Sequence, residues 1–331
     1  MCVISTNGRN PYDARSYSFP PGSLDTCPYQ GFLASLGMTD FLVSILSQER
    51  HTMNYYHQKI AIVTGGGSGI GRALCEALAW AGATVVVAEI DGQAAQETTG
   101  AICRTGGQAR AVCLDVSDAG AVQTLVAGTV AEFGRLDFMF NNAGITKFGE
   151  ARDQTLENWR MVINVNLMGV IYGTDAAYKQ MVQQGHGHII NTASLAGLVP
   201  QPTSVPYTAS KHAVVGLSTA LRAEGVDLGV RVSVVCPAFI QANMIAEQSV
   251  VGVRVSDLYA RRNLALMPTA EQAARAILRG VARNQEIIIF PFYARFLWLI
   301  NRLIPATPLF MRKKIVRDFR RLRERASDPN S

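Results

Sequence analysis

Paired cysteines are the first thing that this sequence lacks. The chain of 331 residues has six cysteines, and no two of them have the spacing of a CxxC motif or a zinc finger. This pattern argues against a disulfide-stapled secreted module and against a structural zinc domain. Cys75, Cys113 and Cys236 fall within apolar patterns, so we expect buried thiols at these positions. We also expect no metal site and a reducing, cytoplasmic setting.

A hydrophobic run long enough to span a membrane is also missing. The apolar stretch at residues 31–46 is interrupted by Asp40. The first residues show no basic segment followed by a cleavage site, so no signal peptide is predicted. Residues 1–57, with their Asn-Gly and Pro-Pro-Gly turns, are predicted to form a poorly ordered N-terminal extension.

The body of the chain lacks an excess of either charge. The formal net charge is +6, and residues 312–325 alone carry eight basic and two acidic side chains. The rest of the chain is therefore formally neutral, which argues against binding to nucleic acid. With 48% apolar and 17% charged residues the composition is that of a folded protein, and the length suits one large α/β domain.

A strand, a glycine-rich turn and a helix follow one another after residue 57. Residues 59–64 are rich in β-branched side chains, residues 72–80 have a helical pattern, and Gly65, Gly69 and Gly71 lie between them. Bare backbone N–H groups at the start of a helix attract phosphate, so this segment predicts a dinucleotide site. Its spacing is Gly-x-x-x-Gly-x-Gly instead of the commoner Gly-x-Gly-x-x-Gly.

An acidic residue ends the second predicted strand, at residues 84–89. Glu89 follows Gly71 by 18 residues, where a carboxylate accepts hydrogen bonds from the adenosine ribose hydroxyls and repels a 2′-phosphate. This favours NAD over NADP as the cofactor. Two alternatives stay open: Asp91 could take that role, or Glu89 could be a solvated charge at a strand end.

Strands and helices alternate along the rest of the chain. Five further strands are predicted at residues 109–116, 136–144, 189–193, 231–237 and 286–291. Further helices are predicted at residues 118–133, 155–184 and 205–227. The alternation predicts a single α/β domain over residues 58–291, built on a Rossmann-type, doubly wound parallel sheet of about seven strands.

A tyrosine and a lysine four residues apart carry the strongest chemical signal. Tyr207 and Lys211 share one face of the helix predicted at residues 205–227. An ammonium group one turn away is expected to lower the pKa of the phenol, which is about 10 in water. Ser194, which follows a strand, could hold a carbonyl oxygen beside Tyr207. Together these groups suit proton transfer at an alcohol or carbonyl oxygen, a reaction that also needs a hydride carrier.

Taken together, the motifs closely resemble those of the short-chain dehydrogenase/reductase family. The resemblance covers roughly residues 58–292. It rests on the ordered motifs Thr64-Gly65-x-x-x-Gly69-Ile70-Gly71, Asn141-Asn142-Ala143-Gly144, Asn166 in Val-Asn-Leu, Ser194 and Tyr207-x-x-x-Lys211.

The resemblance implies a role for each matching residue. Tyr207 would be the general acid/base, and Ser194 would orient the substrate oxygen. Lys211 would bind the nicotinamide ribose and depress the pKa of Tyr207, and Asn166 would hold a water in a proton relay to Lys211. Asp115 would approach the adenine, and Ile240 would contact the nicotinamide carboxamide. The complete cofactor-binding set implied in this way is Gly65, Ser68, Gly69, Ile70, Gly71, Glu89, Asp115, Val116, Asn142, Ala143, Gly144, Tyr207, Lys211, Pro237 and Ile240.

Two positions depart from the family pattern. Family members often have a threonine where this chain has Ala242, so a hydroxyl that helps to bind the cofactor is missing. Ser68 stands where NADP-preferring members often have a basic residue, which agrees with Glu89, although Arg72 could soften the preference.

The resemblance predicts an NAD-dependent oxidoreductase that interconverts an alcohol and its carbonyl compound, with NADP as the less favoured cofactor. The alternatives are an NADP-dependent reductase of carrier-bound 3-oxoacyl chains and a non-catalytic nucleotide-binding scaffold. The substrate pocket is expected after Gly144, after Ser194 and at residues 240–268, where residues 243–267 form a candidate lid with many apolar side chains. The resemblance also implies a homodimer or a homotetramer.

Residues 292–331 form a basic C-terminal extension with two amphipathic stretches, separated by Pro305 and Pro308. An apolar stripe at residues 296–304 is followed by a second stripe, which basic side chains flank and which consists of Ile315, Val316, Phe319 and Leu322. Such a segment, residues 292–325, suits peripheral contact with an anionic membrane, which would fit a lipophilic substrate. The alternative is packing on the enzyme's own body or on a second subunit.

Overall fold

The protein was analysed as a computed structural model that describes residues 52, 54–241, 250–253, 267–304 and 307–326. Two predictions therefore lie wholly or largely outside the described residues: the N-terminal extension, except residues 52 and 54–57, and the candidate lid, except residues 250–253 and 267. Ala242 lies outside them as well.

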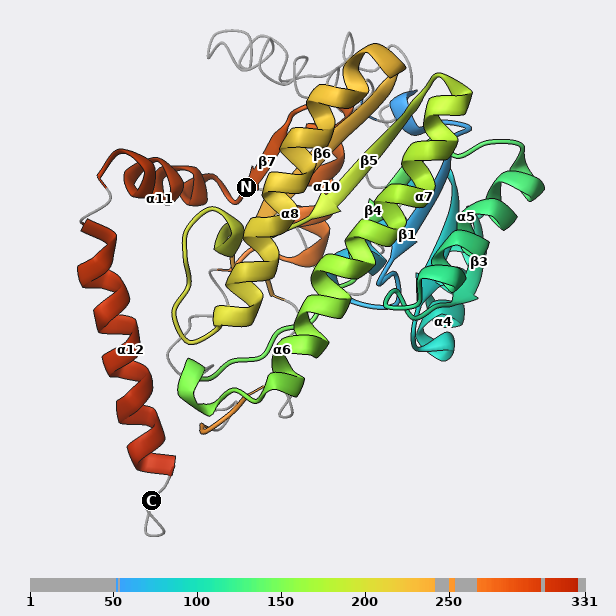
Figure 1. Ribbon diagram of the computed structural model, residues 1–331. Helices are drawn as coiled ribbons and strands as arrows, with labels where there is room; N and C mark the ends of the chain where they lie inside the picture. The colour runs from blue at the N-terminus through green and yellow to red at the C-terminus, as the bar shows by residue number, and fades with distance from the viewer. Residues whose placement is uncertain (1–51, 53, 242–249, 254–266, 305–306, 327–331) are drawn as a thin grey trace, which may run out of the picture. The chain divides into compact units, whose positions relative to one another are not determined.

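Seven parallel strands form one sheet in the order β3-β2-β1-β4-β5-β6-β7 (Figure 1). The strands are β1 (Ile60–Thr64), β2 (Thr84–Glu89), β3 (Gln108–Cys113), β4 (Phe138–Asn141), β5 (Gly187–Thr192), β6 (Val230–Pro237) and β7 (Ile287–Phe290). The order reverses between β1 and β4, where the two halves of a doubly wound sheet meet. The predicted fold class is confirmed.

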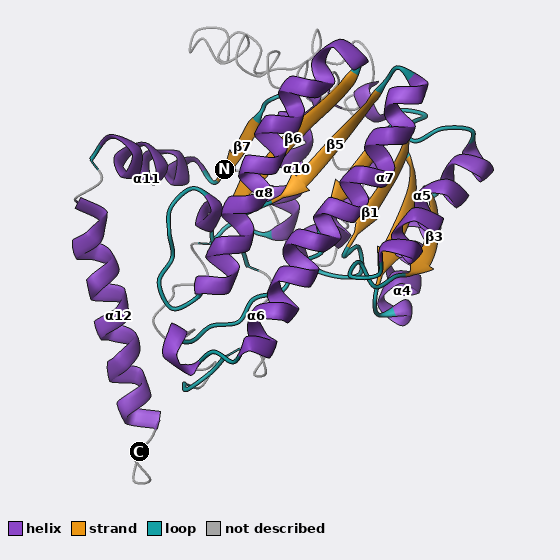
Figure 2. Ribbon diagram, viewed as in Figure 1, coloured by secondary structure: helices purple, strands orange, loops and turns teal. Residues whose placement is uncertain are grey.

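Helices cover both faces of the sheet (Figure 2). One layer consists of α5 (Ala119–Phe133), α7 (Gly169–Gln184) and α8 (Val205–Gly225), of which α7 and α8 run in front of the sheet in the figure. On the other face α3 (Gly69–Trp80) contacts both α4 (Gly92–Arg104) and α10 (Ala270–Ala282). The remaining helices are α6 (Leu156–Ile163), α11 (Phe292–Leu303) and α12 (Thr307–Ala326).

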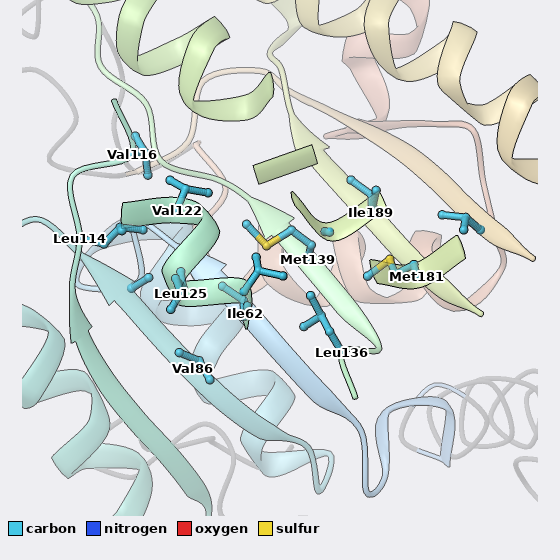
Figure 3. Packing of buried hydrophobic residues seen from close by; sticks show 14 of the residues in the cluster. Ile62, Val86, Leu114, Val116, Val122, Leu125, Leu136, Met139, Met181 and Ile189 are labelled. Atoms are coloured by element: carbon cyan, nitrogen blue, oxygen red, sulfur yellow. The ribbon is translucent and has the colours of Figure 1, made fainter. Parts of the chain in front are cut away.

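One hydrophobic cluster lies between the sheet and the layer that contains α5 and α7 (Figure 3). Strand residues such as Ile62, Met139 and Ile189 are fully buried, because helices cover both faces of the parallel sheet and shield them from solvent. A polar network also crosses this interior: the Asn141 amide donates to Asn191 Oδ1 at 2.8 Å, and the Asn191 amide donates to Ser218 Oγ at 3.0 Å.

Three details differ from the sequence-based expectations. Cys113 is exposed, because it ends β3, the strand at the sheet edge, whereas Cys75 and Cys236 are buried as expected. The single helix predicted at residues 155–184 is divided into α6, a π-helical turn (Asn164–Met168) and α7. Tyr56, inside the predicted extension, is fully buried, and its hydroxyl donates to the Leu278 carbonyl at 2.8 Å.

The C-terminal extension contains α11, which ends at Leu303, and α12, which begins at Thr307. Ala294 of α11 is buried against the core, whereas most large apolar side chains of α11 are exposed. Phe319 and Leu322 of α12 are buried, so the second stripe packs on the enzyme's own body. None of the helices in the described part of the chain is long and apolar enough to cross a membrane.

Candidate active site

The glycine turn after β1 leaves the N-terminus of α3 open to an anion. Gly65 and Gly69 have positive φ angles, and a Cβ atom at Gly71 would lie 1.8 Å from the Gly65 carbonyl oxygen, so no side chain fits between turn and helix. The Ser68 side chain makes no cap hydrogen bond, and the first turn of α3 has no acidic residue. The uncapped amides and the positive end of the helix dipole fit a pyrophosphate.

Glu89 borders this turn from the end of β2. Its carboxylate accepts hydrogen bonds from the Gly67 amide at 3.1 Å and from the Ile90 amide at 2.9 Å. The competing residue, Asp91, caps α4 by accepting from two backbone amides. Arg72 is paired with Glu76 at 2.9 Å. The carboxylate beside the glycine turn is therefore that of Glu89.

Thr64 joins the glycine turn to the segment after β4. Its hydroxyl accepts hydrogen bonds from the amides of Asn142 and Ala143 at 3.0 and 3.1 Å, and the Asn142 side chain donates to the Thr64 carbonyl at 3.0 Å. A Cβ atom at Gly65 would lie 2.9 Å from Ala143 Cα, so the two segments are in close contact. Thr64 was part of the sequence motif but not of the predicted site; its position directly before the first glycine was the available signal.

Asp115 and Val116 follow β3 at the same edge of the sheet. The Asp115 carboxylate accepts from the Ser117 amide at 2.8 Å and from its hydroxyl at 2.7 Å, which fixes the turn. The neighbouring Leu114 amide donates to the Glu89 carbonyl at 2.8 Å. Val116 is buried against Gly169. These residues extend the line of predicted cofactor-binding residues beyond Glu89, along the carboxyl ends of the strands.

Lys211 and Asn166 converge over Gly144. A Cβ atom at Gly144 would lie 3.2 Å from Asn166 Oδ1 and 3.4 Å from Lys211 Nζ. Lys211 is 2% exposed, and its ammonium group donates to the Thr192 carbonyl at 2.8 Å. Burial lowers the pKa of Lys211 to about 8. The group is thus largely charged at neutral pH but close to its titration range.

Asn166 owes its position to the π-helical turn, in which it is fully buried. Its Oδ1 accepts from the Ile145 amide at 2.8 Å, and its Nδ2 donates to the Ile145 carbonyl at 2.9 Å and to Ser210 Oγ at 3.3 Å. The side chain therefore holds the residue that follows Gly144. A wider turn at this point aims a polar group inward without a break in the helix.

Tyr207 and Ser194 complete the cluster beyond Lys211. Lys211 Nζ lies 5.6 Å from the centre of the Tyr207 ring. Burial raises the pKa of Tyr207 above its ordinary value, and a hydrogen bond with Ser194 acts in the opposite direction. The predicted lowering of this pKa by Lys211 is wrong for the protein as described, because desolvation outweighs the opposing contribution. At neutral pH the phenol is protonated.

Pro237 ends β6 beside the same cluster. The Ser194 hydroxyl donates to the Pro237 carbonyl at 3.4 Å and accepts from the Ala196 amide at 3.1 Å. Ile240, three residues further along the chain, is half-buried, and the amide of Gln241 donates to the Pro268 carbonyl at 2.8 Å. The carboxyl ends of β1, β2, β4, β5 and β6 thus bring the predicted residues to one edge of the sheet, where open α/β sheets bind ligands.

This edge combines a phosphate cradle with a proton-transfer group. A protonated phenol, a serine hydroxyl and a buried ammonium lie close together, next to a site that fits a dinucleotide. Within the described ranges there is no group of three or more His, Cys, Asp or Glu side chains that could hold a metal ion. The arrangement can therefore move a proton at an alcohol or carbonyl oxygen with its own side chains.

Comparison with known proteins agrees with this geometry. Cyclohexanol dehydrogenase of Acinetobacter sp. (strain SE19) is 38% identical over 200 residues, which cover 60% of this chain and 80% of that protein. A 3-oxoacyl-[acyl-carrier-protein] reductase of Synechocystis sp. is 39% identical over 187 residues, which cover 56% and 76% of the two chains. Proteins of different named substrates are thus about equally similar.

A solved structure supports the same assignment. The short-chain dehydrogenase/reductase of Burkholderia phymatum in complex with NAD superposes with a TM-score of 0.66 at 30% identity, and the match covers 75% of this chain and 94% of that one. The short chain dehydrogenase family matches residues 59–250, more than half of the chain. The protein therefore belongs to the short-chain dehydrogenase/reductase family and is an oxidoreductase that acts on CH–OH groups.

Proposed function

We propose that the protein is an NAD-dependent dehydrogenase/reductase of a lipophilic alcohol and its carbonyl compound, with Ser194, Tyr207, Lys211 and Asn166 as its catalytic machinery. The observation that carries the proposal is the convergence of the Tyr207 phenol, the Ser194 hydroxyl and the Lys211 ammonium beside the glycine turn. A nucleotide-binding scaffold needs none of these three groups.

The preference for NAD rests on Glu89. Its carboxylate is held at the glycine turn by two backbone amides, and a negative charge there accepts hydrogen bonds from ribose hydroxyls but repels a 2′-phosphate. The Arg72 guanidinium, the basic group nearest in sequence to the turn, is paired with Glu76. The fifteen predicted cofactor-binding residues remain part of the proposal.

The chain's own residues would handle the oxygen and its proton. When bound, NAD supplies or accepts the hydride at the substrate carbon. In carbonyl reduction the protonated Tyr207 hydroxyl donates its proton to the carbonyl oxygen, and in alcohol oxidation the phenolate removes it. The Ser194 hydroxyl holds the same oxygen in place. The Lys211 ammonium supplies positive charge next to the phenolate that forms.

The test is turnover of NAD or NADP with a panel that contains cyclohexanol, long-chain alcohols and a 3-oxoacyl substrate. Tyr207→Phe should lower kcat by about 10²- to 10⁴-fold, whereas Tyr172→Phe, on α7, serves as the matched control and should keep the wild-type kcat. Turnover of the 3-oxoacyl substrate with NADP alone would instead establish the reductase alternative. Turnover that persists in Tyr207→Phe would remove the proposed acid/base.

A peripheral membrane contact through α11 would fit the lipophilic substrate. Phe292, Phe296 and Leu303 are 68%, 54% and 68% exposed, and Arg295 and Arg302 on the same helix are exposed as well. Apolar and basic side chains on one surface helix suit an anionic bilayer surface. Because Phe319 and Leu322 are buried, we restrict this proposal to α11 and the first turns of α12.

Sedimentation of the full chain with vesicles of phosphatidylglycerol and phosphatidylcholine tests this contact. The double variant Phe296→Gln, Leu303→Gln should lose most of the vesicle-bound fraction, and Leu156→Gln, a comparably exposed residue on α6, should not. Equal loss in both variants, or binding that ignores the anionic lipid, would contradict the proposal.

The homodimer or homotetramer, which the family resemblance implies, and the cytoplasmic location, which the cysteine pattern indicates, remain predictions. Sedimentation equilibrium of the purified chain measures the first, and cell fractionation measures the second. A monomer at micromolar concentration would be the contrary result for the assembly.

A further inference from the structure

One buried carboxylate joins the C-terminal helix to the body of the enzyme. Glu150 is 8% exposed, and its Oε1 accepts from Arg320 Nε at 2.9 Å and from Arg320 Nη2 at 2.7 Å. Arg323 pairs with Asp153 at 2.7 Å and with Glu150 at 3.5 Å, and Arg152 pairs with Glu150 at 2.8 Å. Three guanidinium groups thus surround one carboxylate, and two of them come from α12.

Apolar contacts continue the same interface. Phe319 and Leu322 are 5% and 8% exposed, and they pack with Val250 and Val253. A Cβ atom at Gly252 would lie 3.9 Å from Arg323 Cδ, so the Arg323 side chain runs along this segment. Burial of two large side chains, together with an ion pair in which Arg320 donates twice to one carboxylate oxygen, stabilises this contact more than an exposed surface salt bridge does.

The two segments that α12 contacts are bonded to each other, and the segment at residues 147–153 is also bonded to the residues that precede Tyr207. The Val251 amide donates to the Phe148 carbonyl at 2.7 Å, and the Gly149 amide donates to the Thr203 carbonyl at 2.8 Å. The Ser204 hydroxyl donates to the Lys147 carbonyl at 3.2 Å. Ser204 is the residue directly before α8, and Tyr207 is the third residue of that helix.

A continuous stack therefore leads from α12 to the acid/base. It runs from α12 through residues 250–253 and residues 147–153 to residues 203–204 and then to Tyr207. The two inner segments follow β4 and β6, where the sheet presents its ligand-binding edge. Residues 147–153 and 250–253, named here the substrate-side wall, therefore lie beyond the strand ends at which such sheets bind ligands.

We propose that α12 is an intramolecular clamp that holds this substrate-side wall in place, with Glu150 as its anchor and with Arg320 and Arg323 as positioning residues for the alcohol or carbonyl substrate. The substrate named in this inference rests on the proposed function, whereas the clamp itself rests only on the contacts of α12. The clamp is expected to act on substrate binding, because Arg320 and Arg323 bind residues 150 and 153 and the apolar side chains of α12 pack on Val250 and Val253.

The ion pairs also fix the pH range of the clamp. The hydrogen bond from Arg320 lowers the pKa of Glu150 below its ordinary value, and Arg152 contributes in the same direction. A lowered carboxyl pKa means that the stabilisation is complete above the ordinary glutamate range and is lost as the pH falls through the lowered value. The ion pairs of Glu150 in the clamp are therefore formed at neutral pH.

Hydrogen exchange of the full chain tests the clamp without any activity assay. In the double variant Arg320→Gln, Arg323→Gln, exchange of peptides that contain Gly149 and Val251 should be faster by about tenfold or more, because their amides donate to backbone carbonyls within the stack. The control Lys314→Gln, Arg317→Gln, at two exposed residues of the same helix, removes the same charge and should exchange like the wild type. Unchanged exchange in the double variant would overturn the clamp.

Kinetics test the positioning role separately. With cyclohexanol as the probe, the double variant should raise the KM for the alcohol by roughly fivefold or more, and kcat and the KM for NAD should change by less than about twofold. Glu150→Gln should reproduce the effect, and its combination with Arg320→Gln should add little more, because the two groups act as one unit. Faster exchange with an unchanged alcohol KM would refute the positioning role. Absence of turnover in the wild type would count against the proposed function, and the exchange measurement would still decide the clamp.

Discussion

Removal of the Asn166 side chain is the perturbation whose cost follows most directly from the structure. Asn166→Ala deletes three hydrogen bonds from a fully buried position: one accepted from the Ile145 amide and two donated to the Ile145 carbonyl and to Ser210 Oγ. Each buried polar group that loses its partner costs about 1–3 kcal/mol. Because water can reach partly buried Ile145, we expect a total loss of about 4 kcal/mol.

A loss of that size should lower the Tm by about 10 °C in a domain of this length. Thermal unfolding followed by circular dichroism measures it, with Asn158→Ala on neighbouring α6 as the control. Dinucleotide binding should weaken as well, because Gly144, directly before Ile145, lies under both Asn166 and Lys211. If Asn166→Ala unfolds within about 2 °C of the wild type, the hydrogen bonds of Asn166 do not hold this segment and the reasoning fails.

Three further predictions concern the cofactor, the proton and the core. Glu89→Ser should shift the ratio of kcat/KM for NAD over NADP toward NADP by about tenfold or more, and an unchanged ratio would remove Glu89 as the determinant. Because burial raises the pKa of Tyr207, kcat/KM for alcohol oxidation should rise with pH above neutrality, and a flat profile to pH 9 would contradict this. Burial lowers the pKa of His188 to about 3, so the stability that His188 contributes is complete above its ordinary pKa of 6.5 and is lost as the pH falls below it. Between pH 7.5 and pH 5 the free energy of unfolding, measured with urea, should fall by about 2 kcal/mol through this group. His188→Asn should remove this part of the pH dependence. A variant whose stability falls in parallel with that of the wild type would refute the prediction.

Local sequence signals sufficed for the sheet and for most of the site. The glycine turn, Glu89 and Tyr207 each lie next to a strand or helix boundary that the hydrophobic pattern marks, and parallel strands bring such boundaries to one edge. The sequence favoured Glu89 over Asp91, because Glu89 directly follows the apolar run of β2, but it left Asp91 open as an alternative. The cap hydrogen bonds of Asp91 separate them.

Features that depend on contacts between residues far apart in the chain could not be predicted from the sequence. Cys113 falls in an apolar pattern like Cys75, and only the place of β3 at the sheet edge makes it exposed. Arg320 and its partner Glu150 are 170 residues apart, so the basic face of α12 gave no sign of a partner on the enzyme's own body. The raised pKa of Tyr207 likewise depends on burial, which spacing does not reveal.

The chain of amides through the middle of the sheet has a consequence for how faithfully the protein folds. Asn141 on β4 is the register partner of Asn191 on β5, and their side chains meet only in that alignment. A slip of one residue would move the amide of the slipped strand to the opposite face of the sheet, away from the other amide and from its own partner, Thr174 or Ser218. Every misaligned sheet would then carry unpaired amides at a cost of about 1–3 kcal/mol each. These two asparagines therefore favour the correct alignment during assembly: a wrong pairing of the two strands separates their side chains, whereas the correct pairing joins Asn141 Nδ2 to Asn191 Oδ1.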